Sequence, residues 1–289
     1  MKETLELRVN YDYARLLFKA DEGKNMGTSI KVVELSREDP RYSQIPIISE
    51  TVKKKYNRSF FFGWQIKRRY SKKELNNAAL FHLKIKVVFD PTGEECGTLY
   101  DETVACEICG ANRKQISSLI LKKETIPKKD IAKTIGGEVI VSGKFVNSVR
   151  KRDLKGMQFT PINIETYYQL TANTKIELSK NIVMGVNPWN FSEKSEGGTY
   201  NVAGYEIKFE PEIYKCPKGD TIGLNLLSEP YVLDSPLINE VDFFASKQKT
   251  GIKRGLLRPE PIYFCSPAFK KMIEEEKLTG FEFEIANIE

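Results

Sequence analysis

The sequence predicts an α+β fold that is mainly β, with two similar strand-helix-strand units, one near the end of each half of the chain. Three observations lead to this prediction: an internal repeat, short β-rich runs between its copies, and a globular composition. Of the 289 residues, 40% are hydrophobic and 29% are charged, which suffices for a buried core and disfavours wholesale disorder. A chain of this length is expected to form two moderate units.

The internal repeat relates residues 139–159 to residues 262–283. At a constant offset of 124 residues the matching positions are Ser142 and Ser266, Phe145 and Phe269, Leu154 and Leu278, Gly156 and Gly280, and Phe159 and Phe283. Neither segment is of low complexity, so the match favours duplication over chance.

Each copy has the pattern of a strand, a helix and a second strand. The β-rich runs at residues 138–141 and 261–265 both end at a serine, whose hydroxyl can accept a hydrogen bond from a free amide of the first helical turn. Pro267 suits the first helical position because its fixed φ is already helical. Gly156 and Gly280 stand where a residue in the left-handed conformation would end each helix.

Outside the repeat the pattern is mainly that of strands. Strand-like runs occur at residues 5–9, 29–35, 81–89, 204–209 and 230–233. Ser71 and Glu74 form a capping box that predicts a helix continuing through Leu80. We place the boundary between the halves near Glu165, so that residues 1–165 form an N-terminal half with the cysteine knuckle described below and residues 166–289 form a C-terminal half.

Cysteine usage and hydropathy predict a soluble, cytoplasmic protein. Residues 1–19 alternate charged and apolar side chains and lack the continuous apolar stretch of a secretory signal. No apolar run approaches the roughly 18–20 residues that a membrane-spanning helix needs. Five cysteines without a signal peptide fit a reducing compartment, where thiols stay free or bind metal.

The basic charge is spread along the chain. The net charge is +6, but basic clusters such as residues 53–55 and 67–69 are short, and acidic residues are interleaved almost everywhere. This pattern is more typical of solvated faces than of a nucleic-acid-binding stripe.

Cys106-Glu-Ile-Cys109-Gly110 is the clearest chemical signature. Two thiolates separated by two residues can face one tetrahedral zinc ion, and the glycine allows the turn that points backbone amides at the sulfurs. The other ligands must come from elsewhere. Cys216 is the best third candidate, and Asp220 could supply a carboxylate oxygen as the fourth ligand. Four protein ligands would make such a zinc site structural, and the site would join the two halves.

Alternatives to this ligand set remain. Cys96 competes for a place in the site, and Cys265 lies in a predicted core strand, where a buried thiol is inert. Cys106 and Cys109 could also be free cysteines in a turn. A thioredoxin-like redox role is disfavoured because the pair lacks the expected strand-then-helix context.

No catalytic constellation is recognisable, so an enzyme ranks last among the function classes. His82 is the single histidine, and its alternation places it on the polar face of a strand, where a solvent-facing or cross-strand role is favoured. The chain has no G-x-S-x-G elbow, no Walker loop and no G-x-G-x-x-G fingerprint.

Two aromatic clusters are candidate partner-binding surfaces. Phe62 and Trp64 precede the basic residues 67–69, and this mixture also suits a platform for single-stranded nucleic acid. Trp189 and Phe191 lie in a stretch rich in Asn, Pro, Ser and Gly, which predicts an exposed loop. Aromatic anchors of this kind contribute much of the affinity of protein interfaces.

The order of these elements resembles the double-CXXCG motif proteins, a family similar to the immunity proteins that bacteria encode beside polymorphic toxins. The resemblance rests on the 106–110 knuckle, the repeated V-S-x-x-F...L-x-G-x-x-F unit and residues 255–259, and it begins near Leu80. The second motif departs from the pattern, because Cys216 is followed by Pro-Lys-Gly-Asp.

The resemblance implies a protein that inactivates a cognate toxin by binding it, with no chemistry of its own. The positive net charge would suit an acidic toxin surface. The rival prediction is a zinc-knuckle protein that binds single-stranded nucleic acid, for which steep salt dependence of binding would be the signature.

Overall fold

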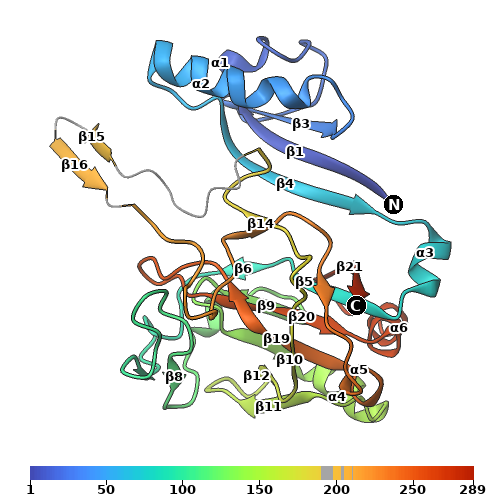
Figure 1. Cartoon of the computed structure of the whole chain (residues 1–289). Helices are drawn as coiled ribbons and strands as arrows, with labels where there is room; N and C mark the ends of the chain where they lie inside the picture. The colour runs from blue at the N-terminus through green and yellow to red at the C-terminus, as the bar shows by residue number, and fades with distance from the viewer. Residues whose placement is uncertain (190–197, 203–204, 210) are drawn as a thin grey trace. The chain divides into compact units, whose positions relative to one another are not determined.

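The computed structural model describes residues 1–189, 198–202, 205–209 and 211–289, and it confirms a mainly β, α+β fold (Figure 1). The chain divides into two compact units, Met1–Asn77 and Ala78–Glu289. This division does not coincide with the boundary expected near Glu165, which lies inside the second unit.

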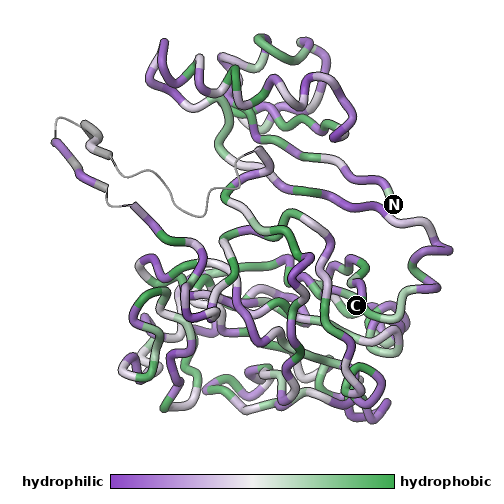
Figure 2. Tube along the Cα trace, viewed as in Figure 1, coloured by the Kyte–Doolittle hydropathy of each residue, from purple (hydrophilic) through white to green (hydrophobic). Residues whose placement is uncertain are grey.

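The first unit contains a four-stranded antiparallel sheet in the order β2-β3-β1-β4. Its strands are β1 (Lys2–Asn10), β2 (Lys24–Met26), β3 (Ile30–Ser36) and β4 (Phe61–Arg69), and its helices are α1 (Tyr11–Ala14), η1 (Tyr42–Gln44), α2 (Ile45–Tyr56) and α3 (Lys72–Asn77). Hydropathy alternates along β1 (Figure 2), as expected for a strand with one buried face.

The capping box at the start of α3 is confirmed. The Glu74 amide donates to Ser71 Oγ at 3.2 Å, and Glu74 Oε2 accepts from the Ser71 amide at 2.6 Å. The helix ends at Asn77, however, and does not continue to Leu80 as predicted. Leu80 instead begins β5 (Leu80–Ile85), where its side chain is fully buried.

Two larger sheets form the second unit. One has the order β13-β19-β20-β5-β21-β18 and the other the order β11-β12-β10-β9-β6. The first sheet contains β5, β13 (Lys175–Ile176), β18 (Tyr231–Val232), β19 (Phe243–Thr250), β20 (Glu260–Cys265) and β21 (Phe281–Ile288). The second contains β6 (Val88–Phe89), β9 (Ile131–Thr134), β10 (Val139–Ser142), β11 (Met157–Pro161) and β12 (Tyr167–Ala172).

The remaining elements of this unit are short. They are β7 (Tyr100–Asp101), β8 (Lys114–Gln115), η2 (Lys123–Thr125), α4 (Gly143–Lys151), β14 (Met184–Gly185), β15 (Gly198–Val202), β16 (Tyr205–Phe209), β17 (Asn225–Leu226), α5 (Leu237–Glu240) and α6 (Pro267–Glu275). The strand predicted at residues 204–209 corresponds to β16, and position 204 lies outside the described residues.

The two large sheets have the same topology over five strands. In one sheet, the parallel pair of β6 and β9 is followed along the chain by β10, α4 and β11. In the other, the parallel pair of β13 and β19 is followed by β20, α6 and β21. A further antiparallel strand separates the two strands around each helix, β12 in one sheet and β5 in the other.

A serine begins both helices in the same way. Ser142 Oγ accepts from the Phe145 amide at 3.2 Å, and Ser266 Oγ accepts from the Phe269 amide at 3.1 Å, as predicted for N-caps. Each serine hydroxyl also donates to an aspartate just before the neighbouring strand. Ser142 donates to Asp130 at 2.8 Å, and Ser266 donates to Asp242 at 2.7 Å.

The same aspartates link the two segments to each other. Asp130 accepts from the Thr279 amide at 2.8 Å, and Asp242 accepts from the Lys155 amide at 2.9 Å. The glycine after each of these amides has a positive φ, 97° at position 156 and 103° at position 280. A Cβ at Gly156 would overlap the Phe243 carbonyl oxygen, and a Cβ at Gly280 would overlap the Ile131 carbonyl oxygen. Only glycine therefore allows the two copies of the repeat to approach each other in this way.

Candidate metal centre

The two cysteine loops occupy equivalent places in the two sheets. Residues 106–110 lie between β6 and β9, and residues 216–220 lie between β13 and β19. The loops meet, and the ligand atoms of Cys106, Cys109, Cys216 and Asp220 all lie within 4.8 Å of one another. The structure thus brings together the four residues that the sequence singled out, and this group could hold a metal ion.

Both loops are closed by the same backbone hydrogen bond. The Cys106 amide donates to the Ala111 carbonyl at 2.8 Å, and the Cys216 amide donates to the Thr221 carbonyl at 2.9 Å. Each bond spans five residues, so the two turns have the same length. Gly110 adopts a φ of 69°, and a Cβ at this position would stand 2.6 Å from Lys253 Cβ. The knuckle therefore needs glycine both for its turn and for its packing.

The sulfur separation fits a tetrahedral ion. Cys106 Sγ and Cys216 Sγ are 3.7 Å apart, and Cys216 Sγ is 4.0 Å from Asp220 Oδ2. Two thiolates about 2.3 Å from a tetrahedral zinc ion stand roughly 3.8 Å apart, whereas disulfide sulfurs are about 2.05 Å apart. All five cysteines are free. The spacing therefore suits shared coordination rather than a covalent bond.

Backbone amides favour the thiolate form at this site. Burial acts to raise the pKa of Cys216, but the amides of Lys218 and Asp220 and the neighbouring thiols hold that pKa below its ordinary value. Burial raises the pKa of Cys109 to about 11, against the opposing effect of the Ala111 amide. Without a cation the Cys109 sulfur keeps its proton, which metal binding would displace.

A second layer of polar groups surrounds the four donors. Asn112 Nδ2 donates to Asp220 Oδ1 at 2.6 Å, which leaves Oδ2 toward the sulfurs. Thr221 is 1% exposed, and its hydroxyl has no hydrogen-bond partner of ordinary length within the described residues. This hydroxyl acts to lower the pKa of Cys109, which favours the thiolate. A buried hydroxyl of this kind gains an acceptor when the sulfur is ionised.

The other two cysteines lie outside this group. Cys96, the competing candidate, is half-buried in a turn whose backbone bonds lead to Thr92 and Gly93. Cys265 is fully buried in β20, and burial raises the pKa of its thiol well above the ordinary value. Its placement matches the inert core cysteine that the sequence predicted.

Sequence reasoning missed a charged network beside the first knuckle. The guanidinium groups of Arg113 and Arg258, each with a side chain 8% exposed, both contact Glu94 and Glu102 at 2.6–3.3 Å. Arg113 also lies 3.7 Å over the Tyr100 ring. Nothing in the local pattern around either arginine predicted that both meet the same two carboxylates, because the two arginines are 145 positions apart in the chain.

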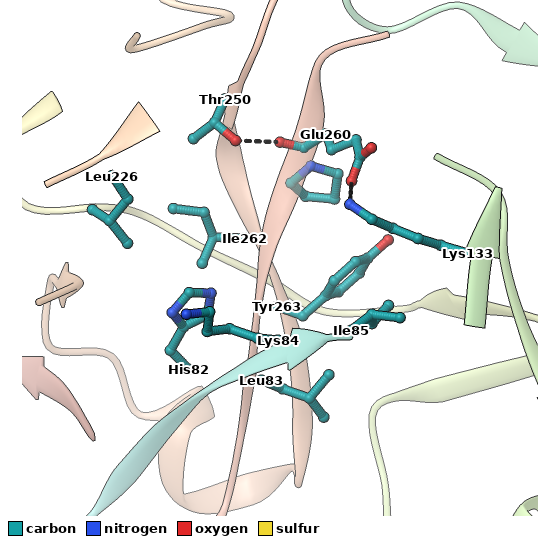
Figure 3. A pocket seen from close by; sticks show the side chains of 11 residues that line it. His82, Leu83, Lys84, Ile85, Lys133, Leu226, Thr250, Glu260, Ile262 and Tyr263 are labelled. Carbon is teal, nitrogen blue, oxygen red and sulfur yellow. Dashed lines mark hydrogen bonds and ion pairs between the residues drawn. The ribbon is translucent and has the colours of Figure 1, made fainter. Parts of the chain in front are cut away.

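His82 lines a separate hollow of about 250 Å³ (Figure 3). It pairs across strands with Glu284, whose Oε2 lies 3.7 Å from His82 Nδ1 and whose Oε1 accepts from Lys84 at 2.9 Å. Figure 3 shows Lys133 and Glu260 as an ion pair at the other end of this hollow. The arrangement agrees with the cross-strand role favoured from the sequence.

The predicted partner-binding aromatics have different environments. Phe62 is 57% exposed because it is the extra residue at a bulge, where Arg8 pairs with Gly63 and Val9 pairs with Phe61. Trp64 is half-buried in β4, opposite buried Leu7. Trp189 is half-buried, and Phe191 lies outside the described residues.

Comparison with known proteins leaves the functional argument to this geometry. No family model matches the chain, and no curated protein resembles it significantly. Among the helices that the structure describes, none has the length and apolar composition to cross a membrane.

Proposed function

We propose that this chain is a cytoplasmic binding protein with a structural zinc ion at Cys106, Cys109, Cys216 and Asp220, and that it neutralises a cognate bacterial toxin by direct contact. The proposal rests above all on the convergence of four donor atoms from two loops more than 100 residues apart in sequence. Three thiolates and one carboxylate favour zinc over the oxygen-preferring cations calcium and magnesium.

Four protein ligands leave no open coordination position for water, so the ion would have a structural role. It would hold together two loops that otherwise share few apolar contacts, since the local cluster consists of Cys109, Ala111 and Cys216 with Cys106 packed against it. We regard the two strand-helix-strand segments as copies of one duplicated unit. In this view the ion lies where the two copies present equivalent loops.

Exposed apolar side chains on the long segment between β6 and β9, which includes the first cysteine loop, favour a protein partner. They are Leu99, Val104, Ile108 and Ile116, all on the excursion between β6 and β9. The Ile116 amide donates to the Leu99 carbonyl at 3.0 Å, so these two residues lie side by side. Exposed apolar side chains that lie side by side on a surface are typical of interaction sites.

The zinc proposal is tested by elemental analysis of the purified full chain. We expect one zinc ion per chain, loss of zinc in Cys106→Ser, and full retention in the matched control Cys96→Ser. Zinc at full occupancy in Cys106→Ser would contradict the ligand assignment.

The partner is tested separately. The chain should co-purify in stoichiometric amount with the toxin encoded beside it and should protect cells that express that toxin. Ile108→Asp with Ile116→Asp should abolish both effects, whereas Val183→Asp, at an exposed apolar position elsewhere in the unit, should not. Protection by the double variant would remove the first loop from the interface.

The second candidate is a protein that binds single-stranded nucleic acid, and one observation favours it. The first unit has 17 Lys and Arg residues against 10 Asp and Glu, a net charge of +7, so the whole basic surplus of the chain lies there. Binding to generic single strands that weakens steeply with salt would support this candidate over the toxin.

A further inference from the structure

A lysine interrupts the buried face of the sheet in the first unit. Along β3, Leu35 and Val33 pair with Leu5 and Leu7 of β1, and the next position of this face pairs Lys31 with Val9. Lys31 is 4% exposed, although the alternation calls for an apolar residue there. A departure from the pattern at a buried position points to a function.

The Lys31 ammonium group is poorly compensated. Nζ donates to the Ala20 carbonyl at 2.6 Å, and no carboxylate pairs with it within the described residues. A buried charge without a counter-ion is costly. Two other partly buried cations of the unit do have carboxylate partners: Lys67 pairs with Glu6 and Glu34, and Arg41 pairs with Asp39 and Glu22.

Lys31 lines a pocket of about 270 Å³ whose other cations are also unpaired. Arg15 and Lys19 contribute to the lining, and their side chains form no ion pair among the residues that the structure describes. Asp12 is the one carboxylate of this lining, so the pocket has a surplus of two positive charges. The remaining lining residues are Tyr11, Ala14, Phe18 and Ala20.

We propose that this pocket binds the phosphate group of a nucleotide, with Lys31 at its floor and Arg15 and Lys19 around it. Ammonium and guanidinium groups offer only donors, which matches a ligand with several acceptor oxygens and negative charge. Tyr11, which is 46% exposed, provides an aromatic surface on which a base could stack. The charge of +7 on this unit would attract such an anion.

The same phosphate chemistry could come from a free mononucleotide or from a nucleic-acid strand. The proposal goes beyond the zinc and toxin proposals, because the pocket lies in the other unit. A negative result for the phosphate pocket therefore does not contradict the zinc and toxin proposals, and a negative result for those does not contradict the phosphate pocket.

The test is calorimetric titration of the full chain with AMP, adenosine, inorganic phosphate and a single-stranded oligonucleotide. We expect AMP and phosphate to bind and adenosine not to bind. Lys31→Met should weaken AMP binding about tenfold or more, because a charged hydrogen bond is lost. The matched control Lys24→Met, on exposed β2 of the same sheet, should bind as the wild type does.

The thermal melting point separates a binding role from a structural one. Met preserves the volume of the lysine stem, so Lys31→Met should melt at the same temperature or higher. The double variant Arg15→Gln, Lys19→Gln, at exposed positions, provides a second test and should also lose AMP.

Tighter binding of the oligonucleotide than of AMP, lost in Lys31→Met, would identify the strand as the source of the phosphate. Equal or weaker binding would identify the free nucleotide. The proposal is overturned if adenosine binds as well as AMP, if no probe binds at millimolar concentration, or if Lys31→Met binds AMP unchanged.

Discussion

The two cysteine loops have the same length and the same closing hydrogen bond, but they place the second donor at different positions. In residues 106–111 the second donor stands three positions after the first cysteine, at Cys109, and in residues 216–221 it stands four positions after, at Asp220. The glycine with positive φ moves the other way, from Gly110 to Gly219. A closed turn thus allows its donor to shift along the chain, provided that a glycine takes the left-handed position.

The sheets beneath the loops differ far less than the loops do. Their serine caps and aspartates make matching hydrogen bonds, of 3.2 and 3.1 Å, 2.8 and 2.7 Å, and 2.8 and 2.9 Å in the two copies. Changes in this shared framework should therefore have the largest effects, changes in the donors smaller ones, and changes in exposed links the smallest.

Gly156→Ala and Gly280→Ala should each lower the free energy of unfolding by about 3 kcal/mol, since strain at positive φ adds to a backbone overlap. Gly97→Ala measures the cost of the backbone strain alone, because Gly97 has a φ of 99° but no atom within 4 Å of its Cβ position. It should cost about 1 kcal/mol. Urea unfolding measures all three, and equal losses would show that the reciprocal packing contributes nothing.

Asp220→Asn should weaken zinc binding more than Asn112→Ala does. The first variant removes the charge of the proposed fourth ligand, and the second removes the amide that orients it at 2.6 Å. Loss of such an orienting partner typically costs about 10–100-fold in metal affinity. Competition with a chelator measures both, and wild-type affinity in Asp220→Asn would exclude the carboxylate from the ligand set.

Glu102 should make the second unit sensitive to acid. Burial acts to raise its pKa, but Lys253, Arg258 and Arg113 outweigh this and hold the pKa at about 2. Because the folded pKa is depressed, the stabilisation is present above the unfolded pKa of about 4.3 and is lost as the pH falls toward 2.

Melting temperatures between pH 5 and pH 2 measure this loss. Glu102→Gln should have a lower melting temperature than the wild type at pH 5, with the difference narrowing toward pH 2. Parallel curves for the two proteins would show that the network does not contribute through this carboxylate.

The ion pair between Lys218 and Glu107 should matter least, although its 2.9 Å contact also joins the two loops. Both side chains are exposed, so solvent screens the attraction and each partner loses rotamer freedom. Lys218→Ala should leave the melting temperature and the zinc content unchanged. A clear drop in either would mean that the exposed link helps to hold the loops together.

Local patterns predicted much of this protein. The serine caps, the capping box at Ser71, the glycine turns and the buried Cys265 all follow from interactions within a few residues, so their signals are present in short stretches of sequence. The four metal donors were also identifiable, because cysteine is scarce in the chain and the knuckle pattern is distinctive.

Other features were beyond reach because they depend on residues far apart in sequence. No local signal places β12 between β10 and β11, or pairs Arg258 with Glu94. The alternation of β3 predicts which face of the strand is buried, but not that the Lys31 ammonium meets a single carbonyl in a cationic pocket.

Propensity, capping and ligand chemistry are properties of a short segment, and the amino-acid order alone specifies them. Which sulfur meets which carboxylate, and which cation lacks a counter-ion, depends on how distant strands pair and pack. Those pairings result from the burial of the whole core, a collective free energy to which each segment contributes only a part.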